Sequence, residues 1–112
     1  MIKCIKRESS VLVKFLGEKI INISNIKILE KKVNKLVKQK TSAVNICLEG
    51  IKFVDSAGIR ALMRLNENSR FEGTEIILSD LSAELMDIFL LLKLENRFKI
   101  ELKSFKDTNR AA

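Results

Sequence analysis

The order of apolar and polar positions predicts a β-hairpin at the start of the chain. Residues 2–6 and 11–16 are rich in apolar and β-branched residues, which favour extended backbone. In the second segment Val11, Val13 and Phe15 alternate with their neighbours in the period of two that is typical of a strand. Glu8, Ser9 and Ser10 between the segments suit a turn. We therefore expect two paired strands, the second of which ends at Gly17.

Residues 26–40 carry the clearest helical pattern in the chain. Apolar residues spaced three and four apart fall on one face, namely Ile26, Leu29, Val33, Leu36 and Val37. The opposite face carries Lys27, Lys31, Lys35 and Lys38. Ser24 or Asn25 can cap the helix start, because their side-chain oxygens accept hydrogen bonds from free amides. The lysine face suits either a solvated surface helix or a binding surface for something anionic.

The rest of the chain alternates predicted strands and helices. A buried central strand is expected at 43–48 and a loop at 49–55, followed by a helix from Ser56 to about Ser69 with Ile59, Leu62 and Met63 inward. A strand at 74–78 follows Gly73, a third helix begins near Ser82, and a last strand spans 98–102. This order predicts an α/β fold, with helices packed on a single-layer, mixed, mainly parallel β-sheet. We expect one domain over 1–112, in which 107–112 form a frayed tail.

One apolar run has two interpretations. Residues 88–94 are apolar nearly all round, which is more than one buried helix face requires. The segment is either well buried or part of an oligomer or partner surface.

Composition narrows the possible chemistry. The 112 residues include no His, which removes the commonest general base and metal ligand. We therefore expect a protein that is not an enzyme and holds no cofactor or metal. Cys4 and Cys47 lie in apolar runs and suggest two buried free thiols in a reducing compartment. The sequence shows neither a secretory signal nor an apolar run of about 20 residues, so we expect a cytoplasmic protein without membrane insertion.

The positive charge is concentrated in the first half of the chain. Residues 1–56 hold 12 Lys and Arg against 5 Asp and Glu, whereas residues 57–112 hold 9 of each. Such an excess suggests an acidic partner, a membrane surface or nucleic acid. Direct nucleic-acid binding is the weakest of these, because the lysines form a simple stripe and only phenylalanines are available for stacking.

The tetrapeptide Asp55-Ser56-Ala57-Gly58 is the strongest candidate site. It follows a buried strand and begins a helix, at the sheet edge where functional groups gather in open α/β folds. A phosphate on Ser56 would be stabilised by the helix N-terminus, and the small Ala57 and Gly58 would let a partner approach. The alternative is that Asp55 or Ser56 merely caps the helix. A usual Ser-His-Asp triad is excluded because the chain has no histidine, and no Gly-rich phosphate loop is present.

The run from Ala43 to Ile59, AVNICLEGIKFVDSAGI, resembles the signature of the STAS family. This family comprises the anti-sigma factor antagonists and related domains of sulphate transporters. The resemblance covers nearly the whole chain, including the early strands, residues 74–78 and the late helix with Leu85 and Phe89. One departure concerns residues 17–22, GEKIIN, which lack the aspartate that many antagonists use to meet their partner kinase.

The resemblance implies a function through protein partners. Ser56, which matches the phosphorylated serine of the family, would be the phosphoacceptor of a serine kinase that is also the anti-sigma factor. A phosphatase would remove the phosphate again. The unphosphorylated form would bind that kinase and free a sigma factor, and the free protein would be a monomer. The implied partner surface comprises Asp55, Ser56, Ala57, Gly58, Ile59 and Met63, although core packing is favoured for Ile59. Asp55 would hydrogen-bond the loop or the partner. Alternatively, the chain is a STAS subunit of a membrane lipid-transport ABC complex that binds its ATPase without a phosphorylation cycle.

Overall fold

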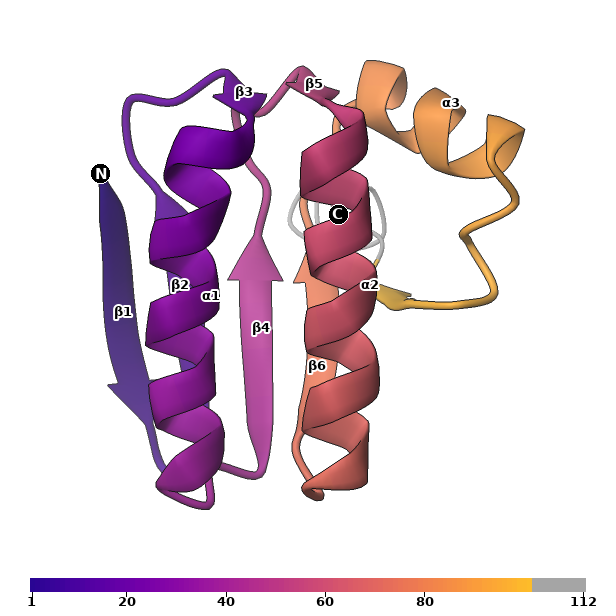
Figure 1. Cartoon of the computed structure of the whole chain (residues 1–112). Coiled ribbons are helices and arrows are strands. Elements are labelled where there is room, and N and C mark those ends of the chain that lie inside the picture. The colour runs from indigo at the N-terminus through magenta and orange to yellow at the C-terminus, as the bar shows by residue number, and fades with distance from the viewer. Residues whose placement is uncertain (102–112) are drawn as a thin grey trace, which may run out of the picture.

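The computed structural model describes residues 1–101, and the predicted tail at 107–112 lies outside them. All the predicted strands and helices are present, and two strands of two residues each are added (Figure 1). In chain order the elements are β1 (Ile2–Arg7), β2 (Ser10–Phe15), β3 (Ile20–Ile21), α1 (Ile23–Lys38), β4 (Ala43–Cys47), β5 (Phe53–Val54), α2 (Ser56–Phe71), β6 (Glu75–Ser79), α3 (Ala83–Leu91) and β7 (Lys99–Glu101).

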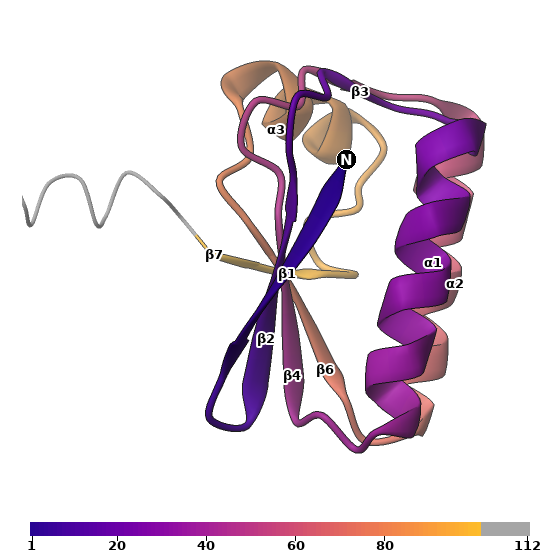
Figure 2. The ribbon, with the colours of Figure 1, turned by 90° about the vertical axis from the view of Figure 1, so that its left-hand side faces the viewer.

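The five longer strands form one mixed sheet in the order β1-β2-β4-β6-β7. Only β1 and β2 pair antiparallel, and the other neighbours are parallel, so the predicted fold class is confirmed. Helices α1 and α2 lie side by side on one face of this sheet, and α3 lies at the carboxyl ends of the parallel strands (Figure 2). Strands β3 and β5 form a separate parallel pair at that same end.

The core lies between the sheet and the two long helices. Alternate residues of β2, β4 and β6 face α1 and α2, because side chains alternate across a strand. The five apolar residues predicted on one face of α1 are all buried, and the four lysines of the opposite face are all exposed. Helix α2 contributes Ala61, Leu62 and Leu65 to the same core.

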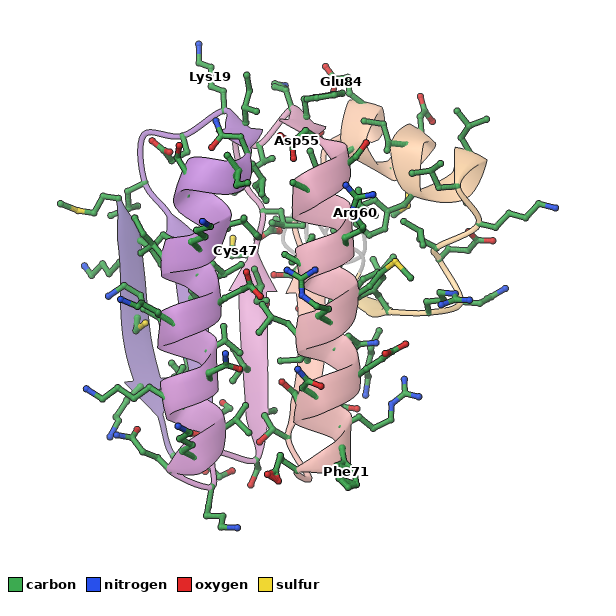
Figure 3. The ribbon with its side chains drawn as sticks, viewed as in Figure 1. Lys19, Cys47, Asp55, Arg60, Phe71 and Glu84 are labelled. Carbon is green, nitrogen blue, oxygen red and sulfur yellow. The ribbon has the colours of Figure 1, made fainter. Side chains whose placement is uncertain are left out.

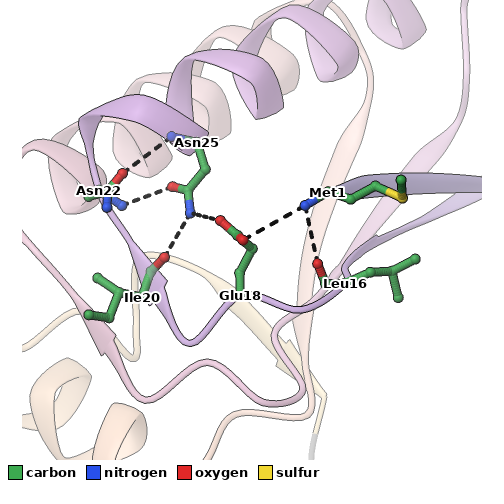
Figure 4. Close-up of polar contacts among 6 residues, drawn as sticks. All are labelled: Met1, Leu16, Glu18, Ile20, Asn22 and Asn25. Atoms are coloured by element: carbon green, nitrogen blue, oxygen red, sulfur yellow. Dashed lines mark hydrogen bonds and ion pairs between the residues drawn. The ribbon is translucent and has the colours of Figure 1, made fainter.

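Helix α1 begins at Ile23, three residues earlier than predicted, and its cap is Asn22 rather than Ser24 or Asn25. The Asn22 side chain accepts from the amides of Ser24 (3.0 Å) and Asn25 (3.3 Å). In return, the Asn22 amide donates to Asn25 Oδ1 at 2.9 Å, which completes a capping box (Figure 4). The predicted start was wrong because three nearby residues are all good caps, and the pattern does not rank them.

Asn25 also ties this helix to the preceding loop. Its Nδ2 donates to Glu18 Oε1 at 2.9 Å and to the Ile20 carbonyl at 2.7 Å (Figure 4). The terminal amine of Met1 lies 3.8 Å from Glu18 Oε2 and donates to the Leu16 carbonyl. The loop that lacks the family's aspartate thus uses Glu18 for an internal contact.

Two expectations about burial need correction. Cys47 is buried at 4% exposure, but Cys4 is exposed, because it lies on the edge strand β1, which pairs on one side only. Both thiols are free. In the apolar run 88–94, Phe89 and Leu94 are buried, but three consecutive leucines are half-exposed or more: Leu90 (50%), Leu91 (81%) and Leu92 (52%). The well-buried interpretation of this run is wrong for those three residues.

Within residues 1–101, no helix is both long enough and apolar enough to cross a membrane.

Candidate functional site at the start of helix α2

Ser56 is the first residue of α2, and its side chain is exposed. It lies at the carboxyl end of the sheet, one residue beyond Asp55 and two beyond the end of β5. Pairing of β5 with β3 fixes this approach, because Phe53 and Val54 stand opposite Ile20 and Ile21. The loop predicted at 49–55 therefore contains a short strand that positions the serine. This strand could not be predicted, because two residues are too few to show a periodic pattern.

Asp55 caps α2 and anchors it to β3. Its Oδ1 accepts from the Gly58 amide at 2.8 Å, and its carbonyl accepts from the Ile59 amide at 2.9 Å. The amide of Asp55 donates to the Ile21 carbonyl at 3.1 Å. The capping interpretation of Asp55 is therefore confirmed, and Ser56 is left outside this set of bonds, at the surface.

Gly58 faces the interior rather than a partner. It is buried, and a Cβ built on it would lie 2.7 Å from Val54 Cγ1 and 3.0 Å from Ile21 Cγ2. The expectation that Gly58 keeps the helix start open to a partner is not met. Its lack of a side chain instead allows α2 to pack closely against β3 and β5.

The remaining predicted residues lie on different sides of α2. Ala57 and Ile59 are half-buried, and Ile59 packs against the core as favoured. Ala57 lines a hollow of about 210 Å³ between α1 and α2. Met63 also packs against the core and lines a hollow of about 260 Å³ next to Phe98, which does not include Ser56. The structure thus brings Ile59 to the serine and places Met63 elsewhere.

Ser56 opens onto a groove between α2 and α3, which we call the α2–α3 groove. It has a volume of about 390 Å³ and is largely apolar. Its lining residues are Phe53, Val54, Ser56, Ile59, Arg60, Ile88 and Leu92. Phe53, Val54 and Arg60 were not predicted as site residues, whereas Ile88 and Leu92 belong to the run 88–94, for which a partner surface was one interpretation. Arg60 has a detectable signal, since a residue four positions after Ser56 shares its helix face.

The charges around the groove come from three elements. Arg60 is exposed on α2 (Figure 3), and in the part of the chain that the structure describes it makes no ion pair or side-chain hydrogen bond. Lys52, before β5, lies 3.7 Å from Glu84 in the first turn of α3. A hydrogen bond from its own backbone amide, followed by the charge of Lys52, lowers the pKa of the Glu84 carboxyl.

A second polar contact lies deeper at this end of the sheet. The Cys47 thiol donates to Asp80 Oδ2 at 3.1 Å. Burial raises the pKa of Cys47, and the neighbouring Asp80 adds to the rise. The thiol is therefore held in its neutral, unreactive form. Ser56, by contrast, carries an exposed hydroxyl-bearing side chain at the same end of the sheet.

Comparison with known proteins identifies the fold. The sequence profile of the STAS domain matches residues 3–108. A putative anti-sigma factor antagonist from Thermotoga maritima is similar in structure, with a TM-score of 0.77 at 14% identity over 98% of this chain and 92% of that chain. An anti-sigma factor antagonist from Mycobacterium paratuberculosis gives a TM-score of 0.73 at 18% identity over 99% and 92%.

A third similar structure is the Bacillus cell fate determinant SpoIIAA in its phosphorylated form, with a TM-score of 0.69 at 13% identity over 100% of both chains. No curated protein matches the sequence. At these identities the structural likeness shows a shared fold. Because the family profile covers nearly the whole chain, the protein belongs to the STAS-domain family.

Proposed function

We propose that this protein is an anti-sigma factor antagonist, a non-enzymatic switch controlled by phosphorylation of Ser56. The observation that carries the proposal is the exposed Ser56 side chain at the first position of α2, next to the largely apolar α2–α3 groove. Structural likeness to three proteins described as antagonists or as a phosphorylated cell fate determinant supports it. The proposed partners are a serine kinase that is also the anti-sigma factor, and a phosphatase.

The covalent step belongs to the kinase. The Ser56 Oγ forms a bond to the γ-phosphorus of a nucleoside triphosphate as the bond to the nucleoside diphosphate breaks. The hydroxyl proton leaves to a base of the kinase. The phosphatase reverses the change with water, which restores the hydroxyl and releases inorganic phosphate.

The added charge supplies the switch. A phosphate carries about −1.5 to −2 charges at neutral pH. Burying that charge in a partly apolar interface, beside the carboxylate of Asp55, adds desolvation and like-charge repulsion. A loss of about 3 kcal/mol weakens binding more than a hundredfold. Asp55 and Gly58 hold the start of α2 in place through internal contacts, so the switch acts at the surface and does not require refolding.

The kinase activity of a captured partner tests the proposal. Unphosphorylated protein, immobilised, is used to capture partners from its host, and the captured protein is then incubated with ATP and soluble chain. We expect the captured partner to phosphorylate the wild-type chain. Its affinity for the phosphorylated chain should then be more than a hundredfold lower than for the unphosphorylated chain. Mass spectrometry of the soluble chain identifies the modified residue.

Ser24→Ala is the matched control, because Ser24 is an exposed serine in the first turn of the neighbouring helix α1. Ser24→Ala should be phosphorylated like wild type, and Ser56→Ala should not be. A captured partner without kinase activity, or one that phosphorylates Ser56→Ala equally, would contradict the proposal.

A second candidate is the STAS subunit of a lipid-transport complex. The exposed lysines of α1, Lys27, Lys31, Lys35 and Lys38, favour it, because they suit an acidic ATPase surface or nearby anionic lipid. Co-purification with an ATPase from the membrane fraction, equal for wild type and Ser56→Ala, would support this role over the switch.

A further inference from the structure

Arg60 and Ser56 share one face of α2. Residues four apart in a helix are neighbours on its surface. Both side chains are exposed, and both line the α2–α3 groove. Arg60 is also the only charged residue among the described residues that line this groove.

The cation of Arg60 is available, unlike that of the next arginine along the helix. Arg64 Nη2 lies 3.4 Å from Glu30 Oε2 on α1. Over residues 1–101, Arg60 has no such partner. An unpaired guanidinium on the surface, next to a hydroxyl that can be modified, is poised to receive an anion there.

The chemistry of the two groups is complementary. A guanidinium presents its N–H donors in a planar fork that matches two oxygens of a phosphate. The positive end of the helix dipole at Ser56 favours the same phosphate. We propose that Arg60 binds the phosphate of phosphorylated Ser56 within the same chain. This inference rests on the proposed function for its biological role, although the contact itself depends only on a phosphate being present.

The consequence for the switch is a reversal of charge in the groove. Without phosphate, Arg60 offers a positive group to an acidic side chain of a partner. With phosphate, the same guanidinium is neutralised by an internal contact while the groove gains negative charge. The phosphorylated surface therefore loses its attraction for an acidic partner and also repels it.

Other charged groups near Ser56 also act on a phosphate at this position. Asp55 opposes the phosphate but is already engaged with the Gly58 amide. Lys52 and Glu84 compensate each other across the β5–α3 side. On the α1 side, Lys27, Glu30 and Arg64 line the neighbouring hollow together with Arg60. Arg60 is thus the group whose removal isolates the proposed contact.

The test installs phosphoserine at position 56 by genetic incorporation, so that no kinase is needed. The second ionisation of the phosphate is followed by phosphorus NMR as a function of pH at low ionic strength. Because a nearby guanidinium stabilises the doubly charged phosphate, it lowers this pKa from its ordinary value of about 6. In Arg60→Gln we expect the phosphate pKa to rise by about 0.3 unit relative to phosphorylated wild type, the size of an exposed pair four residues apart.

Arg64→Gln is the matched control and should leave the phosphate pKa unchanged. High salt should shrink the difference between wild type and Arg60→Gln. Equal phosphate pKa values in wild type and Arg60→Gln, or an equal rise in Arg64→Gln, would overturn the inference. Absence of phosphate from the protein in its host would refute the proposed function but would not change these values, so the two failures can be told apart.

Discussion

A side chain at position 58 would occupy space that Val54 and Ile21 already fill. In an open helix Gly58→Ala should stabilise the protein, because alanine favours helix by about 1 kcal/mol over glycine. Here the added Cβ would lie 2.7 Å from Val54 Cγ1, so we expect a net loss of about 1–3 kcal/mol. Urea unfolding of wild type and Gly58→Ala measures the difference.

A second substitution checks the cause. Val54→Ala removes the Cγ1 atom that the new Cβ would meet, so Gly58→Ala should cost less in a Val54→Ala background than in wild type. An increase in stability from Gly58→Ala alone would show that the helix start is not packed as described.

The buried thiol of Cys47 gives a dependence on alkaline pH. Its pKa in the folded protein is raised above the usual 9.0, so the unfolded chain loses this proton first as pH rises. The stability that the neutral thiol contributes is present below pH 9.0 and is lost as pH rises through the folded pKa. The free energy of unfolding of wild type should therefore fall above pH 9 more steeply than that of Cys47→Ala, which has the same lysines. Parallel pH profiles for the two proteins would contradict this.

At the residue scale, a short motif was sufficient to predict where Asp55 and Ser56 lie in the fold. Ser56 and Asp55 were identified from their place between a strand and a helix, and Asp55 caps as one alternative had it. The inward face of Gly58 could not be predicted, because it depends on Val54 and Ile21, which the fold brings together from separate strands.

At the scale of elements, the junction between the β2–β3 loop and α1 depends on Asn25. This side chain is largely buried and makes hydrogen bonds to Glu18, Ile20 and Asn22. Asn25→Ala leaves those groups without their partner and should cost about 2 kcal/mol of unfolding free energy. Asn34→Ala, on the exposed face of the same helix, is the control and should be neutral or slightly stabilising. Equal effects of the two substitutions would show that the Asn25 contacts contribute little.

Helix faces were predictable because their period is regular, and both faces of α1 are as expected. Element starts were less so, since Asn22, Ser24 and Asn25 compete as caps within four positions. Strands β3 and β5 were missed because two residues show no alternation. These two short strands position Ser56. The elements that determine the geometry of the site were therefore the ones that sequence patterns did not predict.

At the scale of the whole molecule, α3 has one buried anchor and an exposed apolar end. Phe89 is fully buried, and the centroid of its ring lies 5.6 Å from the ring centroid of Phe98. Leu91, by contrast, is 81% exposed. We expect Phe89→Ala to destabilise the fold by about 3–5 kcal/mol, and Leu91→Ala to change stability by less than about 0.5 kcal/mol. Thermal and urea unfolding compare the two. A large loss from Leu91→Ala would place that side chain inside the core instead.

The alternation of strands and helices was sufficient to predict a mainly parallel sheet, and the apolar run at 43–48 predicted its central strand, β4. It was not sufficient to decide whether residues 88–94 are buried. Leu90, Leu91 and Leu92 at the end of α3 are half-exposed or more, and Leu92 lines the α2–α3 groove without being covered by it. An apolar run shows how much burial is possible, but the neighbours available in the fold determine how much occurs.

The intact mass of the protein isolated from its own host shows whether Ser56 is phosphorylated. Wild type, Ser56→Ala and Ser24→Ala are compared across growth conditions. We expect one phosphate on a fraction of wild type and of Ser24→Ala, and none on Ser56→Ala. A phosphate that persists on Ser56→Ala, or wild type that carries none under any condition, would contradict the proposed function.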